Sequence, residues 1–279
     1  MSEKTNELMK KLYDGVEELF ASEKWTAFLK FCASFHRYSA NNLALIYLQR
    51  PDASFVCSYS DWRTQHSRQV RKGSRAIKVI CPHLYKRKDG DDNEEQVLGY
   101  HVASVFDVSD TEPAPNAHDG AADLPLLCRT LDNTISDRDS GLVSLLIDHV
   151  SPVPVDYEDI KSGAHGYYSM SEMRIVIDTK IQGTEQEIKT LLHEIMHAYH
   201  LTSCEEEPDA RTAEVIAESA AFIVCSWLGL DSSMYSMGYV CSWSSDKTHK
   251  ELTASLDTIR NLSEDVISRI EKAMMSDDD

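Results

Sequence analysis

The chain has 279 residues, of which 42% are hydrophobic, enough for one large domain or two of ordinary size, and we expect two. No stretch approaches the roughly 18 to 20 apolar residues that cross a bilayer, and no basic leader with an apolar segment opens the sequence, so we expect a cytoplasmic protein with no membrane partner. The seven cysteines are odd in number and form no C-x-x-C pair, which argues against a zinc knuckle and a disulfide framework.

The formal net charge of −18 is divided unevenly along the chain. Between Lys24 and Lys88, 13 lysines and arginines stand against two acidic residues, a net charge of +11, whereas residues 89–279 carry −26. An acidic surface repels the phosphates of nucleic acid, so any contact with nucleic acid is expected from the basic block.

Three helices are predicted at the start of the chain, followed by strands. The first helix is amphipathic, the third has Ser39 as N-cap, and Pro51 ends it. After Pro51, short β-like runs appear, and the last two of them flank a polar loop as in a hairpin. The predicted helices are 4–22, 24–36 and 39–51, and the predicted strands are 54–59, 76–85 and 97–108.

A stretch rich in Pro, Ala and acidic residues predicts a linker at 113–123, between a first domain at 1–112 and a second at 124–279. The second half predicts mainly helix. Thr184 with Glu187 three residues on is typical of a capping box, and Gly229 ends the next helix. The predicted helices are 124–149, 184–201, 211–230 and 246–275, with one strand at 174–178.

The segment "KTLLHEIMHAYHL" holds His193, Glu194 and His197 in one apolar helix. Residues four apart share a helix face, so both imidazoles can bind one metal ion, and zinc suits them. A catalytic zinc needs a third protein ligand and keeps a position for water, from which Glu194 would take a proton. Two histidines and a glutamate would be costly to bury in such a helix without a metal or strong partners.

The third ligand is expected from the next helix, where Glu214 and Glu218 lie four apart and face the first. We assign Glu214 as the ligand and Glu218 as the carboxylate that orients a ligand histidine. The spacing is symmetric, so the reverse assignment stays open. The strand "RIVID", preceded by "GYYS", is either an edge strand that pairs with an extended peptide or an ordinary core strand.

The basic block alternates with aromatic residues, a pattern typical of single-stranded nucleic-acid binding. The segment "RQVRKGSRAIK" packs cations around a turn at Gly73, and Tyr59 and Trp62 are the candidates for stacking on bases. The alternative is a solvated basic face without a partner. The candidate phosphate contacts are Arg68, Arg71, Lys72, Arg75 and Lys78.

Two parts of the sequence together resemble a known family. Residues 35–82, "FHRYSANNLALIYLQRPDASFVCSYSDWRTQHSRQVRKGSRAIKVICP", and "VFDVSDTE" after them, resemble the single-stranded-DNA-binding N-terminal domain of ArdC-type antirestriction proteins. "KTLLHEIMHAYHL" and "AEVIAESAAFIVCSWLGLD" resemble that family's gluzincin-like metallopeptidase domain, related to the ImmA/IrrE peptidases. Ser67 departs from the pattern, which has glycine at this position.

The resemblance implies a protein of a plasmid, phage or integrative element that protects incoming single-stranded DNA. It also implies His193 and His197 as zinc ligands, Glu194 as acid and base, and a glutamate of the downstream helix as third ligand. The expected fold class is α+β, with a small N-terminal helix-plus-sheet domain that binds nucleic acid and a C-terminal zincin-like metallopeptidase domain.

The leading hypothesis is therefore a zinc metallopeptidase with a single-stranded-DNA-binding module, acting on an unidentified protein or peptide. A second hypothesis is a DNA-binding protein whose zinc site is structural or regulatory and cleaves nothing. A third is a DNA mimic, in which the acidic body, with its charge of −26, occupies the DNA site of another protein.

Overall fold

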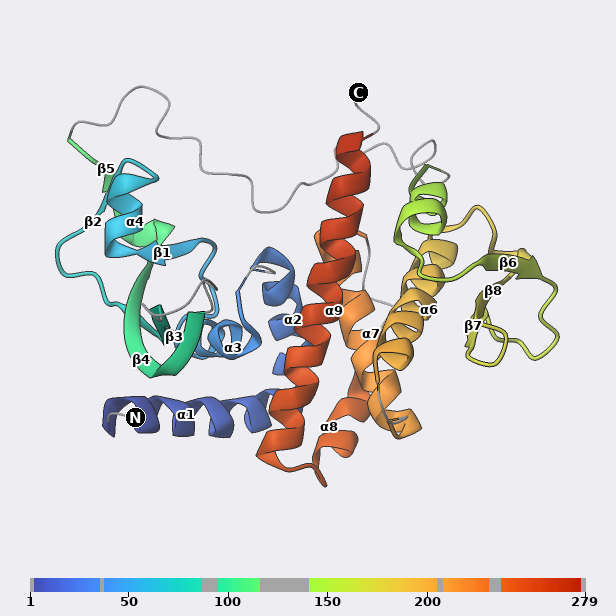
Figure 1. The fold of residues 1–279 in the computed structure, drawn as a ribbon, viewed down its shortest axis with the longest axis horizontal. Helices are drawn as coiled ribbons and strands as arrows, with labels where there is room; N and C mark the ends of the chain where they lie inside the picture. The colour runs from blue at the N-terminus through green and yellow to red at the C-terminus, as the bar shows by residue number, and fades with distance from the viewer. Residues whose placement is uncertain are drawn as a thin grey trace.

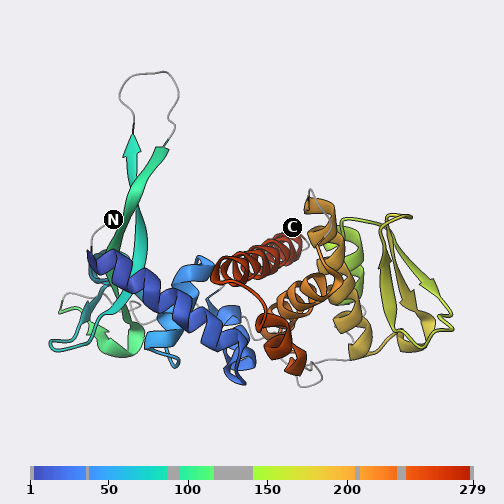
Figure 2. The ribbon, with the colours of Figure 1, turned by 90° about the horizontal axis from the view of Figure 1, so that it is seen from below.

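The computed structural model of the chain describes residues 3–35, 38–86, 95–115, 141–204, 208–230 and 237–276. It is a mixed helix and sheet structure (Figure 1). In the view of Figure 2, the strands β3 (Ile77–Lys86) and β4 (Glu95–Asp107) stand at one end of the molecule, and the sheet that contains β6 (Val155–Glu158) and β8 (Arg174–Asp178) lies at the other. Helices fill the space between them.

The first three helices are those that the sequence predicts. The apolar side chains at helical spacing on α1 are all buried, so this face packs inward as its amphipathic pattern requires. They are Leu8, Leu12, Val16 and Leu19. Ser39 occupies the N-cap position of α3, with extended backbone. The observed bounds are α1 Glu3–Phe20, α2 Lys24–Ser34 and α3 Ala40–Gln49.

Two small antiparallel sheets follow. The predicted hairpin is confirmed, because β3 pairs with β4 and β1 adds to the other edge of β4. Asn42 of α3 bonds both backbone groups of Ile80, which ties α3 to β3. The second sheet pairs β2 with β5. The strands are β1 Val56–Ser58, β2 Arg68–Val70, β3 Ile77–Lys86, β4 Glu95–Asp107 and β5 Thr111–Pro113, with the 3₁₀ turn η1 at Val108–Asp110.

One helix in this half was not predicted. Helix α4, Tyr59–Thr64, begins at the last residue of the predicted strand 54–59. The hydroxyl of Ser58 accepts a hydrogen bond from the Asp61 N–H, the usual cap of a helix N-terminus. Six residues are too few to show a helical period, so only this cap could have indicated the helix.

The second half combines a three-stranded sheet with long helices. The strand order is β6-β8-β7, with β6 parallel and β7 antiparallel to β8. The strand "RIVID" is therefore the central strand β8, and "GYYS" is the edge strand β7. The elements are η2 Leu146–Val150, β6 Val155–Glu158, β7 Gly166–Ser169, β8 Arg174–Asp178, η3 Thr179–Ile181, α6 Glu185–Ser203, α7 Ala210–Trp227, α8 Gly238–Ser244 and α9 His249–Ser276.

The hydrophobic core runs without a break through both halves. Helix α9 lies in the middle of the molecule, with α7 beside it (Figure 1). Helix α2 packs against α7, and α1 and α3 pack against α9. Across this junction Arg260 of α9 donates a hydrogen bond to the Tyr38 carbonyl at 2.7 Å. The helices of the two predicted domains thus share buried surface.

The predicted boundaries at 112 and 123 stay a prediction, because most of the linker lies outside the described residues. The predicted helix at 124–149 is described only from residue 141, where the backbone is helical through Val150. Among the described segments, none of the helices is both long enough and apolar enough to cross a bilayer.

Candidate metal centre

Helix α6 is fixed at its start by a capping arrangement that the sequence predicts. The Thr184 hydroxyl accepts from the Glu187 N–H, and the Glu187 carboxylate reaches back to the Gly183 N–H at 2.6 Å. The Tyr157 hydroxyl of β6 donates to the same carboxylate at 2.6 Å. These bonds set both the start of the helix and its position against the sheet, and so determine where the residues two and three turns later lie.

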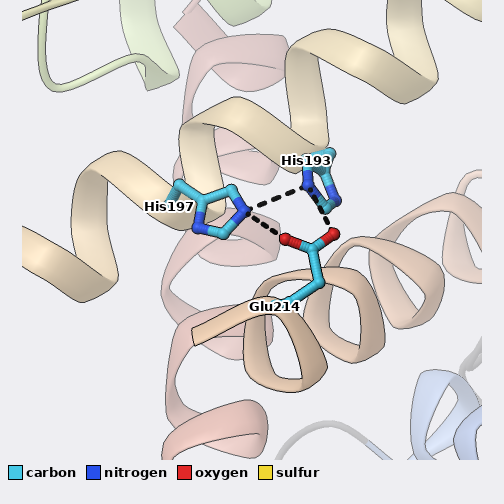
Figure 3. A group of neighbouring side chains, drawn as sticks. All are labelled: His193, His197 and Glu214. Carbon is cyan, nitrogen blue, oxygen red and sulfur yellow. Dashed lines mark hydrogen bonds and ion pairs between the residues drawn. The ribbon is translucent and has the colours of Figure 1, made fainter. Parts of the chain in front are cut away.

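His193 and His197 project from the same face of α6, one turn apart, toward α7 (Figure 3). Glu214 projects from the first turns of α7, whose N-cap Asp209 accepts from the Thr212 N–H. The two Nε2 atoms are 3.1 Å apart, and the Glu214 oxygens lie 3.4 Å from His193 Nε2 and 3.2 Å from His197 Nε2. The structure thus brings together the three residues assigned as ligands.

These separations fit a single small cation. Ligands at about 2.0 to 2.2 Å from a tetrahedral ion lie about 3.3 to 3.6 Å from one another. The two Nε2 atoms are 3.1 Å apart, and each has a Glu214 oxygen, Oε1 or Oε2, at 3.2 to 3.4 Å. The group is the one place among the described residues where three potential ligand atoms lie within 4.8 Å of one another. Two nitrogens and one carboxylate oxygen are a donor set that zinc accepts, with room for further ligands.

The protonation states suit metal binding. Burial lowers the pKa of His193, and the nearby His197 lowers it further, so this imidazole is neutral at pH 7. A neutral imidazole is the form that binds a metal. The hydrogen bond with His197 lowers the pKa of Glu214, against the effect of burial, so its carboxylate is charged. An uncharged His193 nitrogen and an anionic Glu214 oxygen are therefore available to a metal ion.

Glu194 lies beside the three candidate ligands and has a different environment. It is only 7% exposed, and burial raises its pKa to about 7, against the backbone hydrogen bond that it accepts from Tyr168 of the edge strand β7. A carboxyl group with a pKa near the working pH is suited to take up and release a proton. The edge strand therefore holds the residue that the sequence assigns to proton transfer.

A cleft borders these residues and has two parts, which share Gly166, His193 and Glu194. One part, of about 350 Å³, is mainly polar and is lined also by His165, Gln186, Lys189, Thr190 and Glu218. The other, of about 480 Å³, is more apolar and is lined also by Tyr167, Tyr168, Leu201, Pro208, Ala210, Ala213, His197 and Glu214.

Glu218 does not take the role that the sequence analysis assigned to it. It accepts a hydrogen bond from the Tyr239 hydroxyl of α8, and no hydrogen bond joins it to His193 or His197. Burial raises the pKa of Glu218, and the hydrogen bond from Tyr239 offsets only part of this increase. Burial and the same hydrogen bond both raise the pKa of Tyr239. Of the two glutamates, Glu214 is the one placed with the histidines. The sequence offered no signal for Tyr239, since α8 is short and was not predicted.

The candidate phosphate contacts gather near the turn between β2 and β3. Arg71, Lys72, Arg75 and Lys78 are exposed, whereas Arg68 is half-buried and donates to Thr111 Oγ1 at 2.6 Å. Arg71 donates to the Ser109 carbonyl and Lys78 to Ser104 Oγ. The exposed cations of this turn, at 71, 72, 75 and 78, are called the basic turn below.

The two predicted stacking residues differ. Trp62 is fully buried, at 0% exposure, and donates from its indole nitrogen to the Phe106 carbonyl at 2.8 Å, so the prediction that it stacks on a base is wrong. An alternating pattern cannot distinguish a core tryptophan from a surface one. Tyr59 is 58% exposed, and Tyr100 on β4, which the sequence analysis did not single out, is 49% exposed.

The backbone conformation at Ser67 shows why the family pattern has glycine at this position. Its φ is 51°, in the left-handed region where a side chain strains the backbone and glycine is favoured. The turn before β2 therefore keeps the geometry that glycine favours, although serine occupies the position.

Comparison with known proteins agrees with these observations. Residues 1–108 match the family described as the N-terminal domain of anti-restriction factor ArdC. Two crystal structures of the antirestriction protein ArdC from plasmid R388 have the same fold. The Mn(II)-bound form has a TM-score of 0.59, covers 92% of this chain and 97% of its own, and is 16% identical.

The N-terminal part of the chain is an ArdC-type domain, and the chain as a whole has the ArdC fold. The metal-free form of R388 ArdC is also similar to it, with a TM-score of 0.54, 18% identity and coverage of 84% of this chain and 86% of that one. Among curated relatives, the uncharacterized protein pXO2-81 of Bacillus anthracis is 25% identical over 317 aligned residues. The alignment covers 98% of this chain and 52% of pXO2-81, so the chain spans about half the length of that relative.

Proposed function

We propose that this chain is a metal-dependent peptidase whose N-terminal part binds single-stranded DNA, and that it acts in antirestriction. The observation that carries the peptidase half is the arrangement of His193, His197 and Glu214, whose ligand atoms contact one another at 3.1 to 3.4 Å, with Glu194 beside them in an open cleft. A purely structural site would not need either the open cleft or a buried carboxyl group with a raised pKa.

In this proposal each residue has a defined role. His193, His197 and Glu214 would hold the ion, which would supply Lewis-acid activation of the scissile carbonyl and of a water molecule. Glu194 accepts a proton from the attacking water on a carboxylate oxygen and returns it to the leaving amine nitrogen. Among the described strands, none pairs with the outer edge of β7, so the backbone groups there that do not bond Glu194 can hold an extended peptide by main-chain hydrogen bonds.

Zinc is the proposed ion, because two imidazoles and a carboxylate form a donor set that catalytic zinc sites use. The R388 ArdC structure contains Mn(II), and a carboxylate and imidazoles bind manganese as well, more weakly than zinc. Metal analysis of protein purified from medium that contains both metals should give about one zinc per chain.

The test of the peptidase half is the variant Glu194→Gln, which removes the proton acceptor but keeps the size of the side chain. We expect it to bind metal as the parent does and to lose cleavage by at least about 100-fold. The assay follows a mixture of denatured proteins by mass spectrometry. Parent protein that holds stoichiometric metal and cleaves nothing contradicts the proposal and favours a DNA-binding protein with a regulatory metal site.

The DNA half rests on the family match of residues 1–108 and on the basic turn. Changing Arg71, Lys72 and Arg75 to glutamine removes three exposed cations without touching the core. Single-strand binding should weaken, and the slope of log affinity against log salt should flatten by up to about 2, because each phosphate contact contributes about 0.7. The matched control changes three exposed lysines of other regions, Lys161, Lys250 and Lys272. An equal loss of affinity in the control would contradict a DNA site at this turn.

A further inference from the structure

A buried lysine lines the polar part of the cleft. Lys189 lies on α6 one turn before His193, so both side chains are on the same face of the helix. The residue is 7% exposed, although lysine is rarely buried without a partner. Four helical residues advance about 6 Å, close to the roughly 6.6 Å between successive side chains on one face of an extended peptide.

The contacts of Lys189 leave much of its hydrogen-bonding capacity unused. Its ammonium group lies 2.7 Å from Glu185 Oε1, and within the described part of the chain it has no other polar partner. An ammonium group carries three donors. The Glu185 side chain is 39% exposed, but the Oε1 atom that pairs with Lys189 is itself buried. The cleft therefore contains a buried cation with donors to spare.

The neighbours of Lys189 add a donor. Gln186 Nε2 donates to Thr190 Oγ1 at 3.2 Å, which leaves the Thr190 hydroxyl proton free for another acceptor. The two acids that line the polar part of the cleft are already engaged, Glu194 by the Tyr168 N–H and Glu218 by the Tyr239 hydroxyl. A group that only accepts hydrogen bonds and carries negative charge complements this wall, and a carboxylate has both properties.

We propose that Lys189 determines specificity by binding a carboxylate of the peptide substrate next to the cleaved bond. The proposal rests on the peptidase function above. The carboxylate belongs either to an aspartate or glutamate side chain or to the C-terminus of the peptide. The Thr190 hydroxyl provides a second hydrogen bond to it.

The test measures binding, so it needs no substrate and no turnover. Four ligands carry the same metal-binding hydroxamate, followed by glutamate amide, glutamine amide, alanine with a free carboxylate, or alanine amide. Calorimetry with the metal-loaded full chain should show one carboxylate ligand binding about tenfold more tightly than its neutral partner. The pair that shows the preference identifies the source of the carboxylate.

Two variants assign the preference to Lys189. Lys189→Met should abolish the preference and leave the affinity for the neutral ligands unchanged, whereas Lys189→Arg should retain most of it. Lys272→Met, at an exposed position of α9, is the control and should behave as the parent. A parent with no preference in either pair overturns the proposal, as does a preference that survives in folded Lys189→Met.

These binding measurements distinguish failure of the peptidase proposal from failure of the proposed role of Lys189. Absence of cleavage leaves the binding preference unchanged. If the chain binds no metal, the preference is measured with glutarate against glutaramide by NMR titration of the parent and Lys189→Met, and equal binding of the two compounds overturns the role of Lys189.

Discussion

Some residues of the candidate metal centre could be assigned from their spacing in the sequence, and others could not. The H-E-x-x-H spacing was sufficient to single out His193, Glu194 and His197, because spacing along one helix fixes a shared face. Glu214 and Glu218 have the same spacing on α7, and only the packing of α7 against α6 separates them. Tyr239 could not be found at all, since its contact with Glu218 joins residues 21 positions apart through a helix without a sequence signal.

The two glutamates give the first prediction. Glu214→Gln should lower metal affinity by more than about 100-fold, because it removes a charged ligand, whereas loss of an outer partner costs about 10- to 100-fold. Glu218→Gln should lower it by less than tenfold, because Glu218 bonds Tyr239 and neither histidine. Competition with a chelator of known affinity measures both. Equal losses would mean that the two side chains share the ion.

Asp107 is the residue for which the fold makes stability depend on pH. Its carboxylate is 1% exposed and accepts the N–H groups of Ser54, Phe55 and Ser109. Burial acts to raise its pKa, but these bonds and the Ser109 hydroxyl outweigh burial, and the pKa is lowered. Its contribution to stability is therefore complete above about pH 4 and is lost as pH falls through the folded-state pKa.

Asp107→Asn should accordingly destabilise the protein by about 2 to 3 kcal/mol at pH 7, because an amide cannot accept all these bonds. The difference from the parent should shrink as pH falls toward 3. Urea unfolding at several pH values measures it. Asp52→Asn, at a side chain that is 83% exposed, should change stability by less than about 0.5 kcal/mol. A difference that is constant with pH would contradict the assigned role of the carboxylate.

Among the elements, length decided what the sequence could predict. The long helices α1, α6, α7 and α9 repeat their apolar pattern over several turns, so their positions were predicted closely. The short helices α4 and α8 have no such repeat and were missed. The strand β8 was found, but its central place was not, because strand order depends on contacts between distant parts of the chain.

The edge strand β7 depends on a glycine where it meets α6. A Cβ atom on Gly166 would lie 2.7 Å from Thr190 Cγ2 and 3.0 Å from the Val176 carbonyl oxygen, both closer than van der Waals contact. The strand can therefore approach α6 only without a side chain here. This close approach also brings the Tyr168 N–H to Glu194.

Gly166→Ala should thus destabilise the protein by about 1 to 3 kcal/mol, the range for an overpacked site. Hydrogen exchange should show faster exchange of the Tyr168 amide, because the strand moves away from the helix. Thermal unfolding and exchange measured by NMR check both effects. Gly141→Ala is the control, since a Cβ atom there meets nothing within 4 Å. Unchanged exchange at Tyr168 would contradict the dependence of Glu194 on this approach.

For the whole molecule, the sequence predicted two halves with different charge but not their shared core. Charge and composition are local properties, whereas the packing of α2 on α7 and of α1 and α3 on α9 is a contact between segments far apart in the chain. Aromatic residues contribute to this shared core. The ring centroids of Trp243 in α8 and Phe20 in α1 are 5.5 Å apart, and the Trp243 indole N–H donates to Thr212 Oγ1 of α7 at 3.0 Å.

This shared core predicts that the chain unfolds as one unit. Scanning calorimetry should give a single transition whose calorimetric and van't Hoff enthalpies agree, because neither set of helices keeps its buried face without the other. The isolated fragment 1–112 should unfold at a lower temperature than the same residues in the full chain. Two separate transitions would contradict the prediction and restore two independent domains.

The continuous core also limits how such a gene can be recombined. A crossover near residue 112 would join the N-terminal segment of one relative to the C-terminal segment of another, and the apolar faces of the incoming helices would meet helices with which they had not evolved. A functional chimera would need the matching faces of α7 and α9 to travel with α1, α2 and α3. If the proposed DNA binding holds, relatives are therefore expected to differ in DNA affinity through substitutions in the basic turn, and less through exchange of whole domains.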